Sequence, residues 1–370
     1  MATMFRPAVL QSLRLKALAT RCISRQAQTC RVLTPLSATN PSNDIWPGRC
    51  SVTVWKGFST IAETNVETEF YITHEEALRF LEDTLQLLEP KKKLERDPSD
   101  FLNHIIRQMY SRIPFTNMGN TKDFQSFEMP TFSEMKEAMF KRQGGHCVNF
   151  TGFTYLLLQR LGYDSYICDG SHGDGKSNHS AIVVRDLTVP GSKHLVDTGA
   201  GVPLFRAVPL DFNTVSPTYR DDYMTYRLVK RSDGIVVCEK ILSRDHYWDF
   251  AMDKRNENLI GTWYPFMTYE VDVPRDFEFF IENRKYIYEI QNIPPYFLRT
   301  ILLISFPNGR LHSVTNKALF RSSEKGEITY KKLTLQDAKS LCLEHYPQFP
   351  EDAVEDILLF TQSMALKTDD

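Results

Sequence analysis

The segment RQGGHCVNFTGF places one cysteine directly after two glycines, at the start of an apolar stretch with helical spacing. Cys147 therefore falls in the first turn of a predicted helix, where backbone N–H groups lack partners and the helix dipole is positive. Both features favour a thiolate, and the same N–H groups can stabilise an oxyanion on an attacked carbonyl group. Cys147 is a candidate nucleophile, with a buried core cysteine as the alternative interpretation.

A nucleophilic thiol needs a base, and the base needs a group that orients it. The segment SNHSAIVV places His179 at the start of a predicted strand, and HLVDTGAG places Asp197 at the end of another. Taken singly, these would be read as a surface histidine and a turn-capping aspartate. The order Cys147, His179, Asp197 at three element boundaries instead predicts a Cys-His-Asp triad of nucleophile, general base and orienter.

The elements that would position this triad change character along the chain. From residue 70 the apolar spacing is helical, with helices expected over 77–89, 101–113, 133–143 and 147–162, and a charged linker over 90–100. Thr73 with Glu76, and Thr131 with Glu134, are capping-box pairs. From residue 163 the period becomes two, which predicts strands over 163–169, 179–186, 193–197, 223–231 and 234–240. Further strand patterns and two terminal helices follow.

These patterns predict an α+β protein with a cysteine-protease or transglutaminase-like core. We expect a basic N-terminal arm over 1–60, a helical domain over 70–162 that carries the nucleophile, an antiparallel β-barrel domain over 163–260 that carries His179 and Asp197, and an α/β lid domain over 261–370. The length of 370 residues agrees with two or three packed units.

Composition excludes several classes of function. The formal net charge of -2 gives no basic footprint for nucleic acid, and no run of 18 apolar residues predicts a membrane span. The seven cysteines are widely spaced, with no close pair, so we expect neither a metal site nor a disulfide framework. Free thiols are typical of a reducing compartment.

The first 43 residues contain six arginines and lysines and no acidic residue before Asp44. This composition is typical of a mitochondrial presequence. A basic tail, or an upstream start codon that is seldom used, would give the same pattern. The expected location is therefore mitochondrial or cytoplasmic.

From residue 70 onward the chain resembles the arylamine N-acetyltransferases. RIPFTNM (112–118) is similar to the Ile-Pro-Phe-Glu-Asn-Leu segment of that family, and RQGGHC to its Arg-Gly-Gly-x-Cys motif. CVNFTGFTYLLLQRLGY, NHSAIVV and LVDTGAG resemble the helix, histidine and aspartate motifs that follow in family order. The resemblance implies a helical domain, a β-barrel, an α/β lid and a role in xenobiotic metabolism.

The resemblance also implies acyl transfer from acetyl-CoA, or another acyl-CoA, to an aromatic amine or hydrazine. Cys147 would form the thioester, with His179 as base and Asp197 as orienter, in a ping-pong mechanism. CoA is then a co-substrate, no metal is needed, and we expect a monomer. In the loop SHGDGKSNH, Lys176 or Ser177 could contact the CoA phosphates or pantetheine, and Gly199 could let the cofactor approach the backbone. An ordinary solvated turn remains the alternative.

Some positions near the predicted nucleophile depart from the family pattern. Thr116 stands where glutamate is usual, and Asn149 and Thr151 replace the usual glutamate or glutamine and asparagine. His146 stands where an aromatic residue is common, and we expect its side chain to face solvent, with a titrating group beside the thiolate as the alternative. These departures leave two alternatives open: a cysteine hydrolase or transglutaminase-type enzyme, and a non-catalytic binding protein on the same fold.

Overall fold

The computed structural model describes residues 70–118, 129–172, 177–242, 260–288 and 300–366, all within the compact unit Thr60–Asp370. The predicted arm over 1–60 therefore lies outside the described residues. The α-helices have the following bounds: α1 His74–Arg79, α2 Pro90–Arg96, α3 Pro98–Arg112, α4 Phe132–Phe140, α5 Cys147–Arg160, α6 Phe277–Arg284, α8 Leu335–His345 and α9 Glu351–Leu366. Short turns of other helix types are η1 Phe80–Thr84, η4 Lys285–Tyr288 and η5 Pro307–Gly309.

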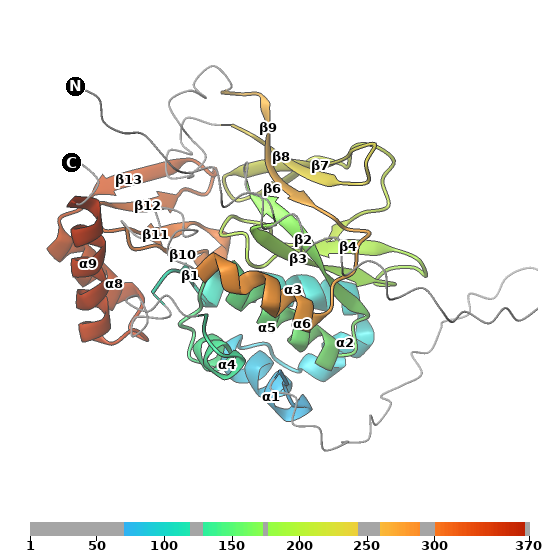
Figure 1. Cartoon of the computed structure of the whole chain (residues 1–370), viewed down its shortest axis with the longest axis horizontal. Helices are drawn as coiled ribbons and strands as arrows, with labels where there is room; N and C mark the ends of the chain where they lie inside the picture. Colours follow the sequence, from blue (N-terminus) through green and yellow to red (C-terminus); the bar gives the residue numbers. More distant parts are fainter. Residues whose placement is uncertain (1–69, 119–128, 173–176, 243–259, 289–299, 367–370) are drawn as a thin grey trace, which may run out of the picture. The chain divides into compact units, whose positions relative to one another are not determined.

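The larger sheet is antiparallel and has eight strands in the order β5-β4-β3-β2-β9-β8-β7-β6. Its strands are β2 Ser165–His172, β3 His179–Arg185, β4 Lys193–Val196, β5 Val208–Pro209, β6 Tyr219–Asp221, β7 Met224–Lys230, β8 Val236–Ile241 and β9 Trp263–Tyr269. The sheet curls around the helical layer of α3 and α5 (Figure 1). This arrangement confirms the predicted α+β class and the five predicted strands between 163 and 240. The sheet continues through β9, beyond the predicted boundary at residue 260.

The smaller sheet has five strands in the order β1-β10-β11-β12-β13. Its strands are β1 Phe115–Thr116, β10 Leu303–Ser305, β11 His312–Val314, β12 Ala318–Ser322 and β13 Ile328–Lys332. Helices α8 and α9 cover this sheet (Figure 1). The sheet and the two helices share a core that includes Val314, Cys342 and Ile357. Because β1 comes from the N-terminal part of the chain, the C-terminal segment is tied to the loop that follows α3. The division into separate domains stays a prediction.

The helical layer follows the sequence patterns with two corrections. Both capping boxes are present: Thr73 caps α1 with Glu76, and Thr131 caps α4 with Glu134. The predicted linker over 90–100 is wrong, because Pro90 opens the short helix α2 and Pro98 opens α3. The predicted helix over 77–89 ends early, since α1 continues as the π-helical turn η1 only to Thr84.

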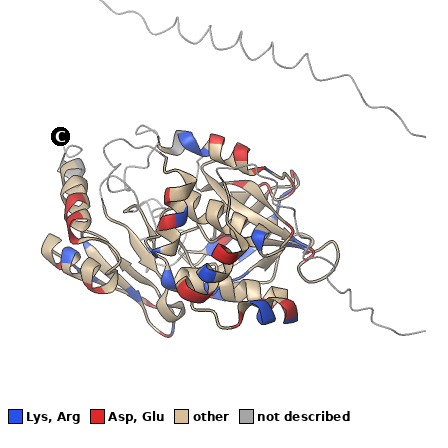
Figure 2. Cartoon of the chain, turned by 90° about the horizontal axis from the view of Figure 1, so that it is seen from below, with Lys and Arg blue, Asp and Glu red and all other residues tan. Residues whose placement is uncertain are grey.

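Charged residues are interspersed along the described elements, as Figure 2 shows for helices that carry both signs. Among the residues that the structure describes, no helix is long and apolar enough to cross a membrane. The charge pattern therefore does not by itself mark a ligand site. The site has to be located from the chemistry and spacing of individual side chains.

Candidate active site

Two glycines bring the chain sharply into the helix that carries the cysteine. Gly144 has φ +71°, and a Cβ there would lie 1.9 Å from the carbonyl oxygen of Pro114. A Cβ on Gly145 would lie 2.4 Å from Cγ of Asn149. The backbone N–H of Thr116 also donates to the carbonyl of Gly145 at 2.8 Å. A side chain would therefore clash at either glycine position. The Pro114–Thr116 segment packs against this loop and holds it by the hydrogen bond from Thr116.

Cys147 is the first residue of α5, as the sequence predicts. The preceding residue, His146, is the N-cap with an extended backbone, and its side chain makes no capping hydrogen bond. The N–H groups of the first turn therefore have no N-cap side-chain acceptor. They can serve an anion that develops next to the sulfur.

His179 and Asp197 meet in the buried interior of the curled sheet. His179 is the first residue of β3, and Asp197 directly follows β4; each has 3% of its surface exposed. Nε2 of His179 lies 2.7 Å from Oδ2 of Asp197. This contact leaves Nδ1 of His179 for the thiol. A Cβ on Gly199 would lie 2.9 Å from Cα of Cys147, so the turn after Asp197 packs against the cysteine backbone.

The electrostatics of the pair favour a thiolate and an imidazolium. Burial raises the pKa of the Cys147 thiol, but hydrogen bonds and charges from His146 and His179 outweigh burial and lower the pKa to about 5. Burial lowers the pKa of His179, but Asp197 and the Cys147 thiolate raise it to about 10. The two groups titrate as a pair, so between these values the ion pair is the dominant form. These interactions thus favour the thiolate form of Cys147 at neutral pH, which is the nucleophilic form of a thiol.

The other described cysteines behave in the opposite way. Cys168, Cys238 and Cys342 are buried, and burial raises the pKa of each thiol. The value for Cys238 and for Cys342 is about 12. Among the four cysteines that the structure describes, Cys147 alone has a lowered pKa. Alkylation at neutral pH should therefore select Cys147 among these four.

The prediction that His146 faces solvent holds only in part, because the residue is half-buried. Its Nδ1 lies 4.0 Å from the Cys147 sulfur, and its ring packs against the ring of Tyr288 with centroids 5.0 Å apart. The Tyr288 hydroxyl is buried and has no hydrogen-bond partner within the described part of the chain. Burial and the Cys147 charge raise the pKa of Tyr288, so it remains a protonated donor. Sequence could not find this pair, since Tyr288 is distant in the chain.

Replacing His146 with phenylalanine should keep the ring contact with Tyr288 but remove one imidazole beside the sulfur. Because His146 lowers the Cys147 pKa, the variant should need a higher pH for half-maximal iodoacetamide alkylation of Cys147. The pH profile of alkylation, followed by peptide mapping, measures this shift. His104→Phe, at an exposed position on α3, is the matched control. Identical profiles for the wild type and His146→Phe would contradict the prediction.

The departures from the family pattern have structural roles here. The Thr151 hydroxyl on α5 donates to the backbone carbonyl of Ser180 on β3 at 2.9 Å, directly after His179. Thr116 is buried, and its hydroxyl accepts from the N–H of Met118 at 3.0 Å. Asn149 is buried against Gly145. Thr151 thus helps to hold the nucleophile helix and the histidine strand together.

The predicted cofactor contacts stay predictions. Lys176 lies outside the described residues. Ser177 is described, and its N–H donates to the Ser171 hydroxyl at 3.0 Å while its carbonyl accepts from Arg284. The Gly199 N–H donates to Oδ1 of Asp197 at 3.1 Å, which gives this glycine a role in holding the carboxylate. Within the described residues, no group of three or more His, Cys, Asp or Glu side chains could hold a metal ion.

Sequence reasoning missed two tyrosines that hold Asp197. The Tyr269 hydroxyl on β9 donates to Oδ2 of Asp197 at 2.8 Å, and the Tyr110 hydroxyl on α3 donates to its backbone carbonyl at 2.7 Å. Together with Gly199, they fix the carboxylate that orients His179. These contacts span 72 and 87 positions of sequence, so no local motif could reveal them.

Comparisons with known proteins match the part of the chain that contains this site. A family model described as N-acetyltransferase matches residues 100–346, which is more than half of the chain and includes all three triad positions. No curated protein matches the chain in sequence.

The fold is similar to that of solved arylamine N-acetyltransferases. The enzyme from Nocardia farcinica has a TM-score of 0.60 at 17% identity, over 78% of this chain and 96% of that one. The enzyme from Salmonella typhimurium has 0.58 at 14%, over 78% and 99%, and that from Mycobacterium marinum, solved in complex with CoA, has 0.57 at 16%, over 76% and 98%. The similarity to these solved structures shows the fold alone, whereas the family model matches the sequence itself. The chain belongs to the arylamine N-acetyltransferase family and is an enzyme.

Proposed function

We propose that the enzyme transfers an acetyl or other short acyl group from acyl-CoA to an aromatic amine or hydrazine, through a thioester on Cys147. The observation that supports this most directly is the thiol at the start of α5, its pKa lowered to about 5 beside the 2.7 Å contact of His179 with Asp197. An ion pair of this kind supplies the attacking sulfur without a metal or a second nucleophile.

In the first half-reaction the Cys147 thiolate attacks the thioester carbonyl of acyl-CoA. The carbonyl oxygen becomes an oxyanion, which the first-turn N–H groups of α5 and the Tyr288 hydroxyl can receive. The carbon–sulfur bond to CoA then breaks, and the imidazolium of His179 donates its proton to the departing CoA sulfur. One thioester replaces another, so little free energy separates the two sides.

In the second half-reaction the amine attacks the acyl-cysteine. Neutral His179 accepts a proton from the amine nitrogen, and the carbon–sulfur bond to Cys147 breaks, which restores the thiolate and imidazolium. Asp197 keeps the Nε2–H of His179 directed at itself throughout, so Nδ1 remains the atom that gives and takes the proton. CoA leaves before the amine reacts, and initial-rate plots at several amine concentrations should be parallel.

Intact-mass analysis after incubation with a panel of acyl-CoAs tests this proposal. Acetyl-CoA should add about 42 Da, the mass of one acetyl group, with release of one thiol. Peptide mapping should place the adduct on Cys147, and an aromatic amine should remove it. Absence of both adduct and thiol release would favour a binding protein on this fold. Transfer to water or to a glutamine-derived acceptor would favour the hydrolase or transglutaminase reading.

The family supports an acyl-CoA donor and an arylamine acceptor. We expect a monomer that uses small aromatic amines or hydrazines, with Lys176, Ser177 and Gly199 near the CoA. We propose a mitochondrial or a cytoplasmic location, because the basic, acid-poor composition of residues 1–60 is typical of a presequence but also fits a basic tail. A fluorescent fusion of residues 1–60 that stayed diffuse in the cytoplasm would contradict import.

A further inference from the structure

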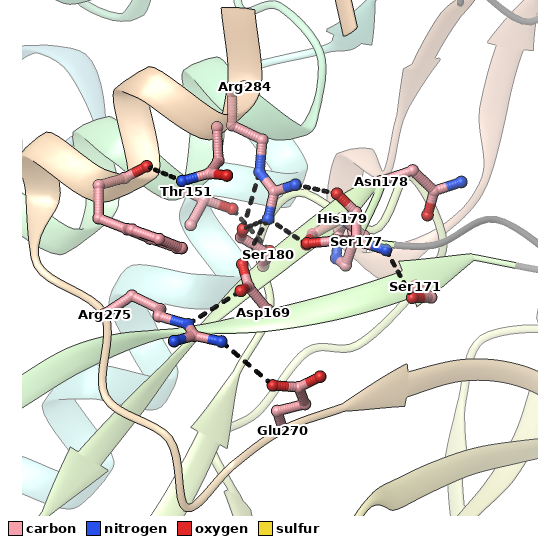
Figure 3. A network of polar contacts seen from close by, with 12 residues as sticks. Thr151, Asp169, Ser171, Ser177, Asn178, His179, Ser180, Glu270, Arg275 and Arg284 are labelled. Atoms are coloured by element: carbon pink, nitrogen blue, oxygen red, sulfur yellow. Dashed lines mark hydrogen bonds and ion pairs between the residues drawn. The ribbon is translucent and has the colours of Figure 1, made fainter. Parts of the chain in front are cut away.

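A fully buried arginine joins the C-terminal part of the chain to the strand that carries the histidine. Arg284 is the last residue of α6, and 1% of its surface is exposed. Figure 3 shows its guanidinium reaching from the helix across β2 and β3, among Asp169, Ser180 and His179. A buried guanidinium is costly unless its donors are satisfied, so the identity of its acceptors indicates what it does.

The acceptors of Arg284 lie at the start of β3, just before it, and on the paired strand β2. Nε donates to the hydroxyl of Ser180 at 3.0 Å, and Nη2 donates to the backbone carbonyl of His179 at 2.7 Å. Nη1 donates to the backbone carbonyl of Ser177. Nη2 also pairs with Oδ1 of Asp169 on β2 at 2.9 Å. Three acceptor groups within the segment 177–180, which contains His179, are therefore held by one rigid fork.

The strand register explains why one side chain can reach these groups. Asp169 lies opposite Ser180, and Gly170 lies opposite His179, in the antiparallel pair of β2 and β3. Arg284 crosses this pair at the end where β3 begins. Fixing the backbone of His179 there fixes the direction of its side chain, and with it the contact with Asp197.

The same helix also packs against the helix of the nucleophile. A Cβ on Gly152 of α5 would lie 3.1 Å from Cε1 of Phe280, and the rings of Tyr155 and Phe277 stack with centroids 5.9 Å apart. Helix α6 thus contacts α5 through Phe277 and Phe280, and β3 through Arg284. Because α6 contacts both the helix of Cys147 and the strand of His179, it can set the distance between the thiol and the imidazole.

We propose that Arg284 is a positioning residue for the catalytic histidine, and that the docking of α6 through this residue sets the reactivity of Cys147. The proposal rests on the proposed function for the roles of Cys147 and His179. Neutralising the charge of Asp169 does not explain the role of Arg284, because Arg275 already pairs with the other oxygen of Asp169 at 2.9 Å. What distinguishes Arg284 is its set of bonds to Ser177, His179 and Ser180.

Arg275 therefore provides a matched control. It shares the carboxylate of Asp169 with Arg284, but its other side-chain contacts are Glu270 at 3.3 Å (Figure 3) and the ring of Phe279, 4.8 Å from the guanidinium carbon to the ring centroid. Arg284→Met and Arg275→Met each remove one guanidinium from the same carboxylate. Only the first removes the hydrogen bonds to the histidine strand.

The primary measurement is the pH profile of iodoacetamide alkylation at Cys147 in the full chain. Arg284→Met should raise the apparent thiolate pKa by about one unit from its value of about 5, which makes alkylation at pH 5 about fivefold slower. Arg275→Met should leave the profile within about twofold of wild type. Arg284→Lys can keep the ion pair with Asp169 but lacks the planar set of N–H donors of a guanidinium, so it should give an intermediate profile.

The second measurement is acyl transfer, which separates this proposal from the proposed function. Arg284→Met should lower kcat by up to about 100-fold with little change in KM, as misplacement of a catalytic group does. If the wild type transfers no acyl group, the proposed function fails, while the alkylation profile still reports on Arg284.

A further variant keeps the test decisive if Arg284→Met does not fold. Ser180→Ala removes the hydroxyl that accepts from Arg284 but leaves the ion pair with Asp169, and it should shift the profile in the same direction. Equal profiles for Arg284→Met and Arg275→Met would overturn the proposal. If Arg284→Met is unfolded, wild-type profiles for both Ser180→Ala and Arg284→Lys would overturn it.

Discussion

Replacing Cys147 with alanine is expected to abolish acyl transfer. The side chain supplies the atom that becomes the thioester, so nothing else in the site can carry the acyl group between the two half-reactions. The loss should be at least about a thousandfold in kcat, since removal of a nucleophile leaves only the contribution of binding and the oxyanion site. Steady-state rates and intact-mass analysis with acetyl-CoA measure the result.

The control for this prediction is Cys342→Ala. Cys342 is buried in the core between α8 and the smaller sheet, and its thiol is protonated at neutral pH because burial raises its pKa to about 12. This variant should lose some stability but should still be acylated. Turnover by Cys147→Ala within a few-fold of wild type would remove Cys147 as the nucleophile.

The positions of Cys147, His179 and Asp197 at the ends of their elements could be predicted from sequence, because local patterns reveal these boundaries. Gly144 and Gly145 indicate a sharp turn, the apolar stretch after Cys147 indicates a helix, and period-two strands place His179 and Asp197 at strand ends. Such signals lie within about ten residues of the side chain concerned. These signals show where the chain enters a helix or leaves a strand. Such boundaries determine whether side chains can converge on one site.

The residues that hold the triad could not be predicted in this way. Tyr269 reaches Asp197 across 72 positions, and Arg284 reaches His179 across 105. The aromatic-rich sequence around α6 is typical of core packing, and Phe277 and Phe280 do lie in the core. Arg284 lies within it and is buried, whereas charged residues are seldom fully buried unless they are paired. Its partners are defined only by the fold.

His146 shows the same limit closer to the nucleophile. A histidine at a helix N-cap, next to glycines, is expected to face solvent. The structure instead places Tyr288 against its ring, because η4 follows α6 and brings this tyrosine over the start of α5. The local sequence gives the position of His146 on the helix but not what covers it.

Replacing Asp197 with asparagine should preserve the fold but slow acyl transfer by about three to four orders of magnitude, by analogy with the serine-protease triad. Oδ2 of Asp197 accepts from His179 and Tyr269, while Oδ1 accepts from the N–H of Gly199. An asparagine has only one acceptor oxygen, so one of these donors must face an NH2 group. If that donor is His179, its Nε2 becomes an acceptor and its single ring proton moves to Nδ1. A protonated Nδ1 cannot accept a proton from the attacking amine.

The pH dependence gives this prediction a second readout with a definite sign. Asp197 raises the pKa of His179, and His179 lowers that of Cys147. Without the carboxylate, the imidazolium should be lost at lower pH, and the thiolate should form only at higher pH, toward the ordinary thiol value of about 8.5. Alkylation of Cys147 near pH 6 should therefore slow strongly in Asp197→Asn.

Asp221→Asn is the matched control for both readouts. Asp221 is buried on β6, where it accepts from the Tyr226 hydroxyl at 2.8 Å and pairs with Arg206, and it is not hydrogen-bonded to any member of the triad. Its loss should lower the melting temperature while leaving the alkylation profile unchanged. If Asp197→Asn kept near-normal kinetics and an unshifted profile, His179 would have to be oriented by Arg284 and the β3 backbone alone, and the carboxylate would be a structural group.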